Sequence, residues 1–534
     1  MLVIKGYSLG MLRFGLNNVR RLKNTSLVDL RPITILVGRN SSGKSTFLRT
    51  FPLLRQSLMT RTSSPILWYG DLVDFGEFED VVHDNRSESR ISFSFGLDNV
   101  TTEPSFVTLD GGGYGATQKR AGPVDVELFV SGRDRKTKLD GFSFRLGNPS
   151  NVFDVSIDDS GSLSGISRNG ESVMHLFDGA IVSFQLGSIF PNILLRSKEQ
   201  EEGRYFYQPF QNPVHDHLAS LLRPHVDRRL RDDQIGRFAI NLLMMDEFSI
   251  SELEGVKNRT GTRSFLKILT DMAGKNTRGL REKVQQMYEV NQFFSIVGAT
   301  FSSLKTKISS TLYIGPVRAR SERYYRYQDL AVSEIDPDGK NFPMFLTSLT
   351  SSQRTNFSKW VKERFGYGVE VVQNSGHISI KLANGDKTTN IVDNGYGISQ
   401  VLPVLGQIWW ASRGAIGRRR VIGAANSSML LIEQPELHLH PAHQALLADA
   451  VVGERVSSTP RDPDVSFIIE THSEAFVNRL GALIAEGKVR ADDVQILVFE
   501  QDDEDEKITS VRVSRFTSGG TLTNWPYGFF QPTV

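Results

Sequence analysis

Gly38-Arg39-Asn40-Ser41-Ser42-Gly43-Lys44-Ser45 decides the fold of this chain, because it satisfies every position of the phosphate-binding pattern G-x-x-x-x-G-K-S/T. Its glycines allow a tight loop whose backbone N–H groups point at phosphate oxygens, and a following helix adds its positive N-terminal end. Lys44 supplies a point charge to the β- and γ-phosphates, Ser45 offers a hydroxyl to Mg²⁺, and Thr46 is placed to reach the α-phosphate. We therefore expect ATP to be held by Gly38, Asn40, Ser41, Gly43, Lys44, Ser45 and Thr46.

The sequence on both sides of this loop has the pattern that a phosphate loop requires. An apolar run from Thr34 to Val37 predicts a strand that leads into the loop. Behind the loop, apolar residues recur at helical spacing over residues 46–58. The predicted strand, glycine turn and helix follow one another in the order that a phosphate loop requires. This agreement argues against a glycine turn that matches the pattern by chance.

The remaining chain divides into stretches of different pattern. From about 65 to 185 short strands alternate with polar turns, and from about 213 to 310 the pattern is helical. Strands and helices alternate again from 392 to 484. We predict an α/β fold with an N-terminal lobe over 1–100, a β-rich and then helical insertion over 101–310, and a C-terminal lobe over 311–534.

Acidic residues follow two further apolar strands. The strand Ser428 to Ile432 runs into Glu433-Gln434-Pro435-Glu436, and a phosphate-loop enzyme needs such carboxylates to hold Mg²⁺ and to orient the attacking water. The strand Val465 to Ile469 runs into Glu470-Thr471-His472-Ser473, where His472 is placed to sense a γ-phosphate. The alternatives are a core strand with a charged end and a structural histidine.

A second candidate anion site lies far from the phosphate loop in sequence. Gly395 and Gly397 precede an apolar helix over residues 401–410, and its N-terminal N–H groups and Ser399 could hold an anion. Because one ATP does not need two helix N-termini from one chain, this site suggests a second copy.

Composition limits the other classes of function. The chain has 534 residues, a net charge of +2 and no cysteine, which excludes disulfides, thiolate zinc sites and cysteine nucleophiles. We expect no transmembrane helix, no signal peptide and a cytoplasmic location. Clustered arginines at 223, 228, 229 and 231 suggest either a salt-bridged helix surface or a nucleic-acid or partner surface.

These motifs resemble those of the ABC/SMC-type AAA family ATPases, in the group of the overcoming-lysogenization and Septu anti-phage defence ATPases, over about 1–100 and 310–534. The resemblance is carried, in chain order, by Asn18-Val19-Arg20, Tyr313-Ile314-Gly315-Pro316-Val317-Arg318, Asp393-Asn394-Gly395-Tyr396-Gly397-Ile398-Ser399-Gln400, Glu433-Gln434-Pro435-Glu436-Leu437-His438-Leu439-His440-Pro441, Thr471-His472-Ser473 and Trp525-Pro526-Tyr527-Gly528-Phe529-Phe530. Val19 replaces the family's usual aromatic residue.

The resemblance implies an ABC-type P-loop ATPase head with an insertion, working as a homodimer with ATP sandwiched between two copies. It implies that Arg20, Gly395, Gly397, Ser399 and Gln400 contact the nucleotide and that Ser45 and Glu433 hold Mg²⁺. Glu433, Gln434, Glu436 and His472 are the implied catalytic residues. Gln434 stands where ABC heads have a catalytic glutamate, so we expect slow turnover, with the water-orienting role open between Gln434 and Glu436.

The function that this resemblance implies is an ATPase that gates a separate nuclease or toxin subunit in prokaryotic defence. The alternatives are an SMC-type DNA-maintenance or repair ATPase, which would need long coiled-coil arms, and a weakly hydrolysing ATP-switch scaffold. We expect no nuclease activity from this chain, no membrane partner, and nucleic acid, if bound, on the insertion. A metal cluster of His438, His440 and His443, or an H-x-H site at His215 and His217, is a weaker possibility.

Overall fold

The computed structural model describes residues 12–83, 90–102, 105–108, 114–117, 120–133, 136–147, 151–177, 180–185, 187–197, 213–245, 248–259, 262–273, 278–413, 427–456, 464–502 and 507–526. The chain forms two compact units. The first contains residues 1–61, 66–93 and 305–534, and the second contains residues 62–65 and 94–304. The expected sequence breaks at 100 and 310 lie near these boundaries. The motif residues Tyr527 to Phe530 and the N-terminal residues 1–11 lie outside the described residues.

A seven-stranded sheet with the order β17-β22-β23-β4-β24-β25-β26 organises the first unit. The strands from β17 to β24 along this order are parallel, and β25 and β26 are antiparallel additions. Parallel strands buried on both faces read as continuous apolar runs, as in β4. The strands are β4 (Ile33–Gly38), β17 (Thr311–Ile314), β22 (Ser427–Glu433), β23 (Asp464–Glu470), β24 (Val494–Gln501), β25 (Thr509–Phe516) and β26 (Leu522–Thr523).

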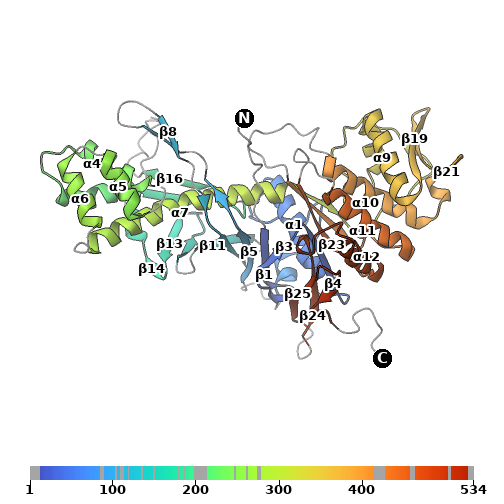
Figure 1. Ribbon diagram of the computed structural model, residues 1–534, viewed down its shortest axis with the longest axis horizontal. Coiled ribbons are helices and arrows are strands. Elements are labelled where there is room, and N and C mark those ends of the chain that lie inside the picture. Colours follow the sequence, from blue (N-terminus) through green and yellow to red (C-terminus); the bar gives the residue numbers. More distant parts are fainter. Residues whose placement is uncertain are drawn as a thin grey trace. The chain divides into compact units, whose positions relative to one another are not determined.

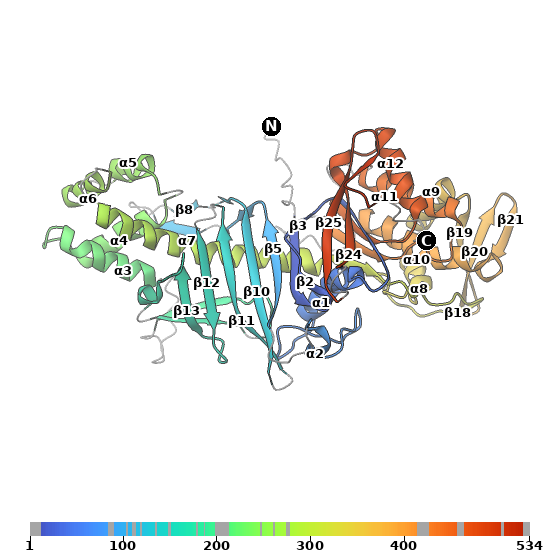
Figure 2. The ribbon, with the colours of Figure 1, turned by 90° about the horizontal axis from the view of Figure 1, so that it is seen from below.

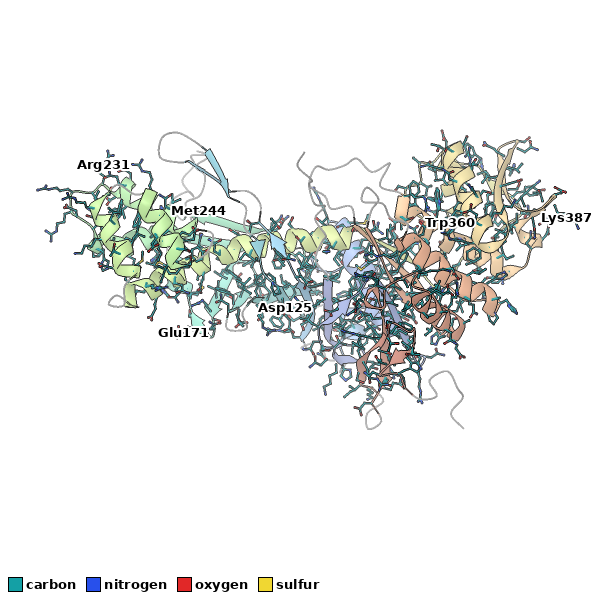
Figure 3. The ribbon with its side chains drawn as sticks, viewed as in Figure 1. Asp125, Glu171, Arg231, Met244, Trp360 and Lys387 are labelled. Carbon is teal, nitrogen blue, oxygen red and sulfur yellow. The ribbon has the colours of Figure 1, made fainter. Side chains whose placement is uncertain are left out.

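The first unit also contains helices, several of which pack on this sheet (Figure 1). They are α1 (Lys44–Met59), α2 (Phe78–Val81), α8 (Phe342–Ser348), α9 (Ser351–Phe365), α10 (Tyr396–Arg413), α11 (Pro441–Val456) and α12 (Glu474–Ala485). One hydrophobic core joins the sheet to α8–α12, with Trp360 of α9 buried in it (Figure 3). The strand, loop and helix expected around the phosphate loop are therefore present as β4 and α1.

Antiparallel strand pairs complete the first unit. β1 (Leu12–Val19) pairs with β2 (Leu22–Asn24) and β3 (Val28–Leu30). β20 (His377–Asn384) pairs with β18 (Tyr325–Arg326), β19 (Gly368–Asn374) and β21 (Lys387–Asn390). β24 and β25 likewise form an antiparallel hairpin. The acidic tip of this hairpin, residues 503–506, lies outside the described part of the chain.

The second unit begins with an antiparallel sheet (Figure 2), in which β10 to β14 pair in chain order. These strands are β10 (Val124–Arg133), β11 (Lys136–Leu146), β12 (Val152–Ile157), β13 (Leu163–Arg168) and β14 (Glu171–Ser172). Short pairs are made by β6 (Val100–Thr101) with β9 (Arg120–Ala121), β7 (Ser105–Thr108) with β8 (Tyr114–Thr117), and β15 (Ala180–Phe184) with β16 (Ile193–Ser197). β5 (Arg90–Leu97) runs across the boundary at residues 93 and 94.

Helices follow the strands in the second unit, as the sequence pattern predicted. They are α3 (Pro213–Leu222), α4 (Asp232–Leu243), α5 (Ile250–Arg259), α6 (Arg263–Ala273) and α7 (Arg278–Ser309), of which α7 crosses the boundary at residues 304 and 305. Phe144 and Phe153 of the sheet pack on Phe293 of α7, which joins strands and helix in one core. Among the described helices, none has the length and apolar character needed to span a membrane.

Candidate nucleotide site

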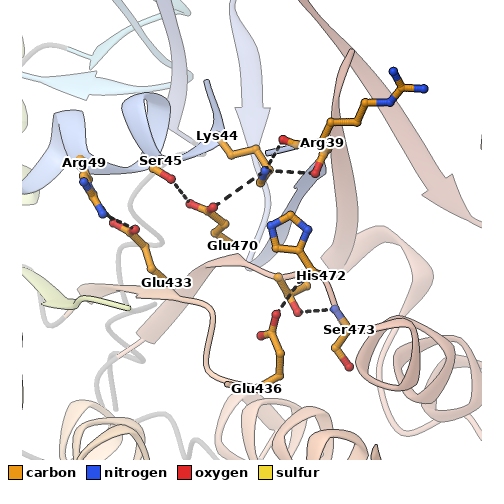
Figure 4. Close-up of polar contacts among 11 residues, drawn as sticks. Arg39, Lys44, Ser45, Arg49, Glu433, Glu436, Glu470, His472 and Ser473 are labelled. Atoms are coloured by element: carbon orange, nitrogen blue, oxygen red, sulfur yellow. Dashed lines mark hydrogen bonds and ion pairs between the residues drawn. The ribbon is translucent and has the colours of Figure 1, made fainter. Parts of the chain in front are cut away.

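The phosphate loop connects β4 to α1 through a backbone that glycine makes possible. Gly43, directly before α1, has φ 91°, a left-handed conformation that side-chain-bearing residues rarely adopt. At Gly38 an added Cβ would lie 2.6 Å from the Phe499 carbonyl oxygen. The loop and β24 can therefore lie this close only because position 38 carries no side chain. Lys44 Nζ donates to the carbonyls of Gly38 at 3.1 Å and Arg39 at 2.8 Å, which holds the ammonium over the loop (Figure 4).

A cavity of about 350 Å³ lies against this loop. The phosphate-loop residues Asn40 to Thr46 line it together with Arg20, Arg21, Gln434 and Glu470. Ser42 Oγ is buried there and has no hydrogen-bond partner among the described residues. The cavity thus combines backbone N–H groups with a buried lysine, and these are groups that bind a polyphosphate.

Glu470 is the carboxylate that meets the phosphate-loop hydroxyl. Ser45 Oγ donates to Glu470 Oε2 at 2.8 Å, and Lys44 Nζ lies 3.9 Å from Glu470 Oε1. Glu470 is 2% exposed, and burial, together with the nearby Glu433 carboxylate, raises its pKa to about 7. The sequence places Glu470 at the end of an apolar strand, but nothing in its local pattern marks it as a site residue.

Glu433 lies at the end of β22 and is held by two other side chains. Arg49 of α1 binds it in a bidentate ion pair with distances of 2.7 and 2.8 Å, and Tyr313 Oη of β17 donates to Oε1 at 2.7 Å. Although burial opposes it, hydrogen bonding to Glu433 raises the pKa of Arg49 above its usual value. Among the described residues no hydrogen bond joins Glu433 to Ser45, the pair that we expected to hold Mg²⁺. Arg49 has no sequence signal beyond its place in α1.

Gln434 and Glu436, which closely follow β22, lie in different surroundings. Gln434 has φ 43°, donates its backbone N–H to the Glu470 carbonyl at 2.8 Å, and lines the cavity. Arg318, which is buried, donates to the carbonyls of Glu433 at 2.9 Å and Gln434 at 3.3 Å and so fixes this turn. Burial lowers the pKa of Arg318 to about 10.

Glu436 is buried and contacts the segment that carries His472. The His472 backbone N–H donates to Glu436 Oε1 at 2.7 Å, and burial raises the pKa of Glu436. Glu436 Oε2 has no hydrogen-bond partner among the described residues. Ser473, the next residue, caps α12 by accepting from the Phe476 N–H at 3.0 Å, so the position of His472 is fixed from both sides. Partial burial lowers the pKa of His472, and the positive charge of the nearby Lys44 lowers it further. A neutral imidazole is therefore favoured near the phosphate loop (Figure 4).

The signature residues lie at the start of α10 and form a second glycine-led helix N-terminus. Gly395 has φ 82°, and both it and Tyr396 are exposed. An added Cβ on Gly397 would lie 2.3 Å from the His438 carbonyl oxygen, so this glycine permits contact with the segment after β22. Ser399 is buried and its Oγ donates to the Tyr396 carbonyl at 2.7 Å, whereas Gln400 donates to the Ala319 carbonyl at 3.0 Å. The exposed groups here are therefore Gly395 and Tyr396 rather than the Ser399 side chain.

Arg20 reaches the cavity from the turn after β1. It has φ 49°, its guanidinium stacks 4.6 Å from the Phe75 ring centroid, and Nη2 donates to the Phe75 carbonyl at 3.1 Å. These contacts hold Arg20 beside Asn40 and Ser41, where it lines the cavity.

The residues around the cavity fit a magnesium–nucleotide complex. Mg²⁺ prefers oxygen ligands and usually binds one or two carboxylates together with phosphate oxygens. Ser45 Oγ and Glu470 supply such oxygens beside Lys44, and the loop N–H groups remain for phosphate. In the described part of the chain, no cluster of three or more His, Cys, Asp or Glu side chains is arranged to hold a metal ion by itself.

The residues that the sequence suggested as weaker metal-binding or nucleic-acid-binding sites make ordinary surface contacts. His215 contacts Asp216 and the Gly236 carbonyl. In the arginine cluster, Arg223 pairs with Asp232 at 3.6 Å and the exposed Arg231 with Asp233 at 3.3 Å (Figure 3), as a salt-bridged helix surface would. Arg228 and Arg229 are exposed.

Two sequence families match this chain. Residues 282–477, which include the signature, β22 and His472, match the family described as an AAA ATPase domain. Residues 489–531 match a family described as a protein of unknown function (DUF3696). The first match spans less than half of the chain, and its description agrees with the phosphate loop and the α/β fold built on the parallel sheet. No curated protein matches the sequence.

Solved structures of SMC heads cover most of the chain at low similarity. One is the SMC head bound to the C-winged helix domain of ScpA, with 10% identity, coverage of 94% of this chain and 97% of that chain, and a TM-score of 0.32. A second is the Smc head with an extended coiled coil bound to the C-terminal domain of ScpA derived from Pyrococcus furiosus, with 11% identity, coverage of 94% of this chain and 96% of that chain, and a TM-score of 0.31. A third is the SMC head domain from Thermotoga maritima, with 10% identity, coverage of 94% of this chain and 98% of that chain, and a TM-score of 0.32. TM-scores near 0.3 at about 10% identity add no support of their own.

Proposed function

We propose that this chain binds ATP with Mg²⁺ and hydrolyses it slowly as an ABC-type ATPase that closes as a homodimer around the nucleotide. The observation that carries the proposal is the presence of two glycine-led helix starts, at Gly43 and Gly395. The first faces a cavity built by this chain, and the second begins with exposed residues. In a head-to-tail dimer, the Gly395 helix start of one copy would meet the nucleotide held by the other.

The geometry of the cavity supports defined roles for its residues. Lys44 and the loop N–H groups would bind the β- and γ-phosphates, and Arg20 would border the nucleotide. Mg²⁺, when bound, neutralises charge that develops on the phosphates. Gln434 lines the cavity, where its amide can orient water without accepting a proton as a strong base. His472, kept neutral, would sense the γ-phosphate and report its presence to α12 through Ser473.

The positions of the two residues favour Gln434 over Glu436 as the one that orients the attacking water. Gln434 lines the cavity, whereas Glu436 is buried and bound to the His472 N–H. Glu436 would therefore brace the switch segment, and the absence of a glutamate at position 434 is the reason to expect slow turnover. The same observation supports a second candidate, an ATP-held switch that hardly hydrolyses. Turnover near zero with nucleotide-dependent closure intact would favour this switch.

The cellular role that we propose is gating of a separate effector, a nuclease or toxin, in anti-phage defence. The support is the sequence of motifs from Tyr313 to His472, in the order found in defence ATPases. An SMC-type DNA-maintenance role is less favoured, because the described insertion is an antiparallel sheet with helices of 10–12 residues and the single longer helix α7. The purified chain alone should cut neither DNA nor RNA.

Closure can be measured directly. Light scattering of the purified chain should show a doubled mass on addition of a non-hydrolysable ATP analogue and the original mass after its removal. Because a dimer of another geometry could hide this change, cysteines introduced at exposed Arg39 and Gly395 should cross-link between copies only when the analogue is present. No analogue-dependent cross-link and no change in mass would contradict the proposed dimer.

A further inference from the structure

Two glutamates end neighbouring strands at the same level of the parallel sheet. The register aligns Glu433 with Glu470, and Glu470 with Leu36 of the strand that enters the phosphate loop. Because adjacent strands are about 4.8 Å apart, Glu470 is one strand spacing from the loop strand and Glu433 is two. The fold therefore brings Glu470, and not Glu433, next to the start of the phosphate loop.

The side-chain contacts follow the same division. Glu470 accepts from Ser45 Oγ at 2.8 Å, lies 3.9 Å from Lys44 Nζ, and lines the cavity. Both oxygens of Glu433 are engaged by Arg49, and Oε1 also accepts from Tyr313. To reach Ser45, Glu433 would have to give up a buried bidentate ion pair, which costs more than the rearrangement of a single hydroxyl contact.

A purely structural role for Glu470 explains less of this arrangement. If its task were to neutralise Lys44, the ammonium would lie within hydrogen-bond distance, yet Lys44 donates to the Gly38 and Arg39 carbonyls. The close contact is with Ser45, the hydroxyl whose position in the phosphate loop suits a divalent cation. Hydroxyl and carboxylate oxygens side by side are ligands that Mg²⁺ accepts, directly or through water.

We infer that Glu470, together with Ser45, is the side-chain carboxylate that holds the divalent cation of the bound nucleotide, and that Glu433 is a positioning residue. Glu433 fixes Arg49 and Tyr313 and so ties α1 to β17 and β22. This inference rests on the proposed function, since it assigns the metal ligand of the same site.

The test compares two isosteric substitutions, Glu470→Gln and Glu433→Gln. A fluorescent ATP analogue is titrated into each purified protein, once with EDTA and once with Mg²⁺, and the ratio of the two dissociation constants gives the metal's contribution. Electron paramagnetic resonance of bound Mn²⁺ provides a readout that does not depend on hydrolysis. Thermal unfolding shows whether each variant is folded, and Glu470→Asp, which keeps a carboxylate, serves as the conservative variant.

The wild-type protein should bind the analogue more tightly with Mg²⁺. Glu470→Gln should reduce this metal-dependent gain about 10–100-fold while leaving binding in EDTA unchanged or tighter, because a negative charge beside the phosphates is gone. Glu470→Asp should keep part of the gain, and Glu433→Gln most of it.

Opposite behaviour overturns the inference. Loss of the metal-dependent gain in Glu433→Gln with its retention in Glu470→Gln would assign the cation to Glu433, and retention in both variants would assign it to neither. If the wild-type protein bound no analogue with or without Mg²⁺, the proposed ATPase function itself would fail, which is a separate outcome.

Discussion

The helices α1 and α10 begin alike and differ in what surrounds their first turn. Each follows a glycine with positive φ, Gly43 at 91° and Gly395 at 82°. At α1 the chain supplies its own lysine, acid and amide around one cavity. At α10 an added Cβ on Gly395 would meet no atom within 4 Å, and Tyr396 is 47% exposed.

This difference shows that a helix N-terminus becomes a nucleotide site only through what tertiary structure places next to it. The N–H groups and dipole are common to both helices. Only α1 has a neighbouring strand end that contributes Glu470 and a neighbouring turn that contributes Gln434. Gly395 and Tyr396 at the start of α10 are exposed, which is why we propose that a second copy meets them there.

The largest effect is expected at the α1 site. Lys44→Ala removes the buried ammonium that faces the phosphates, and it should weaken ATP binding at least about 100-fold, since several charge-assisted hydrogen bonds are lost together. Equilibrium titration with a fluorescent ATP analogue measures this. The matched control is Lys387→Ala on exposed β21 (Figure 3), which should bind normally. Equal affinities in both variants would mean that α1 does not bind nucleotide.

A smaller effect is expected at the α10 site, and it should concern association alone. Gly395→Asp puts a carboxylate at an exposed helix N-terminus that we propose meets phosphate, and repulsion should weaken analogue-dependent dimerisation about tenfold. Gly395→Asn is the matched control, because Asn has nearly the same shape and, like Asp, tolerates positive φ. Analytical ultracentrifugation separates the two variants. If both dimerise equally, the α10 start does not recognise an anion.

The smallest effect is expected at Glu436, which we propose braces the switch segment instead of orienting water. Glu436→Gln keeps an oxygen that can accept from the His472 N–H, so single-turnover hydrolysis should fall less than about tenfold. A catalytic base would instead cost about 10²–10⁴-fold and trap the closed dimer. Rapid-quench measurement of one turnover decides between the two roles, and Glu436→Ala, which leaves that N–H unpaired, should be the more damaged variant.

The local structural elements of this protein could be predicted from short stretches of sequence. Neighbouring residues predict the phosphate loop between β4 and α1 and the apolar strands β22 and β23 that end in acids. Such features depend on periodicity and on glycine conformations, which adjacent residues fix. The β-rich and helical order of the insertion was visible for the same reason.

Which acid meets which partner was decided by tertiary structure alone. Glu433 and Glu470 both end apolar strands in the sequence, and nothing local distinguishes them. The parallel order β22-β23-β4 puts Glu470 beside the phosphate loop and leaves Glu433 to Arg49 and Tyr313, which come from α1 and β17. Likewise, Ser399 reads as an exposed ligand in the sequence, but the packing of α10 buries it and turns its hydroxyl to the Tyr396 carbonyl. The sequence determines which chemical groups are present, and strand order and helix packing determine which of them face the same cavity.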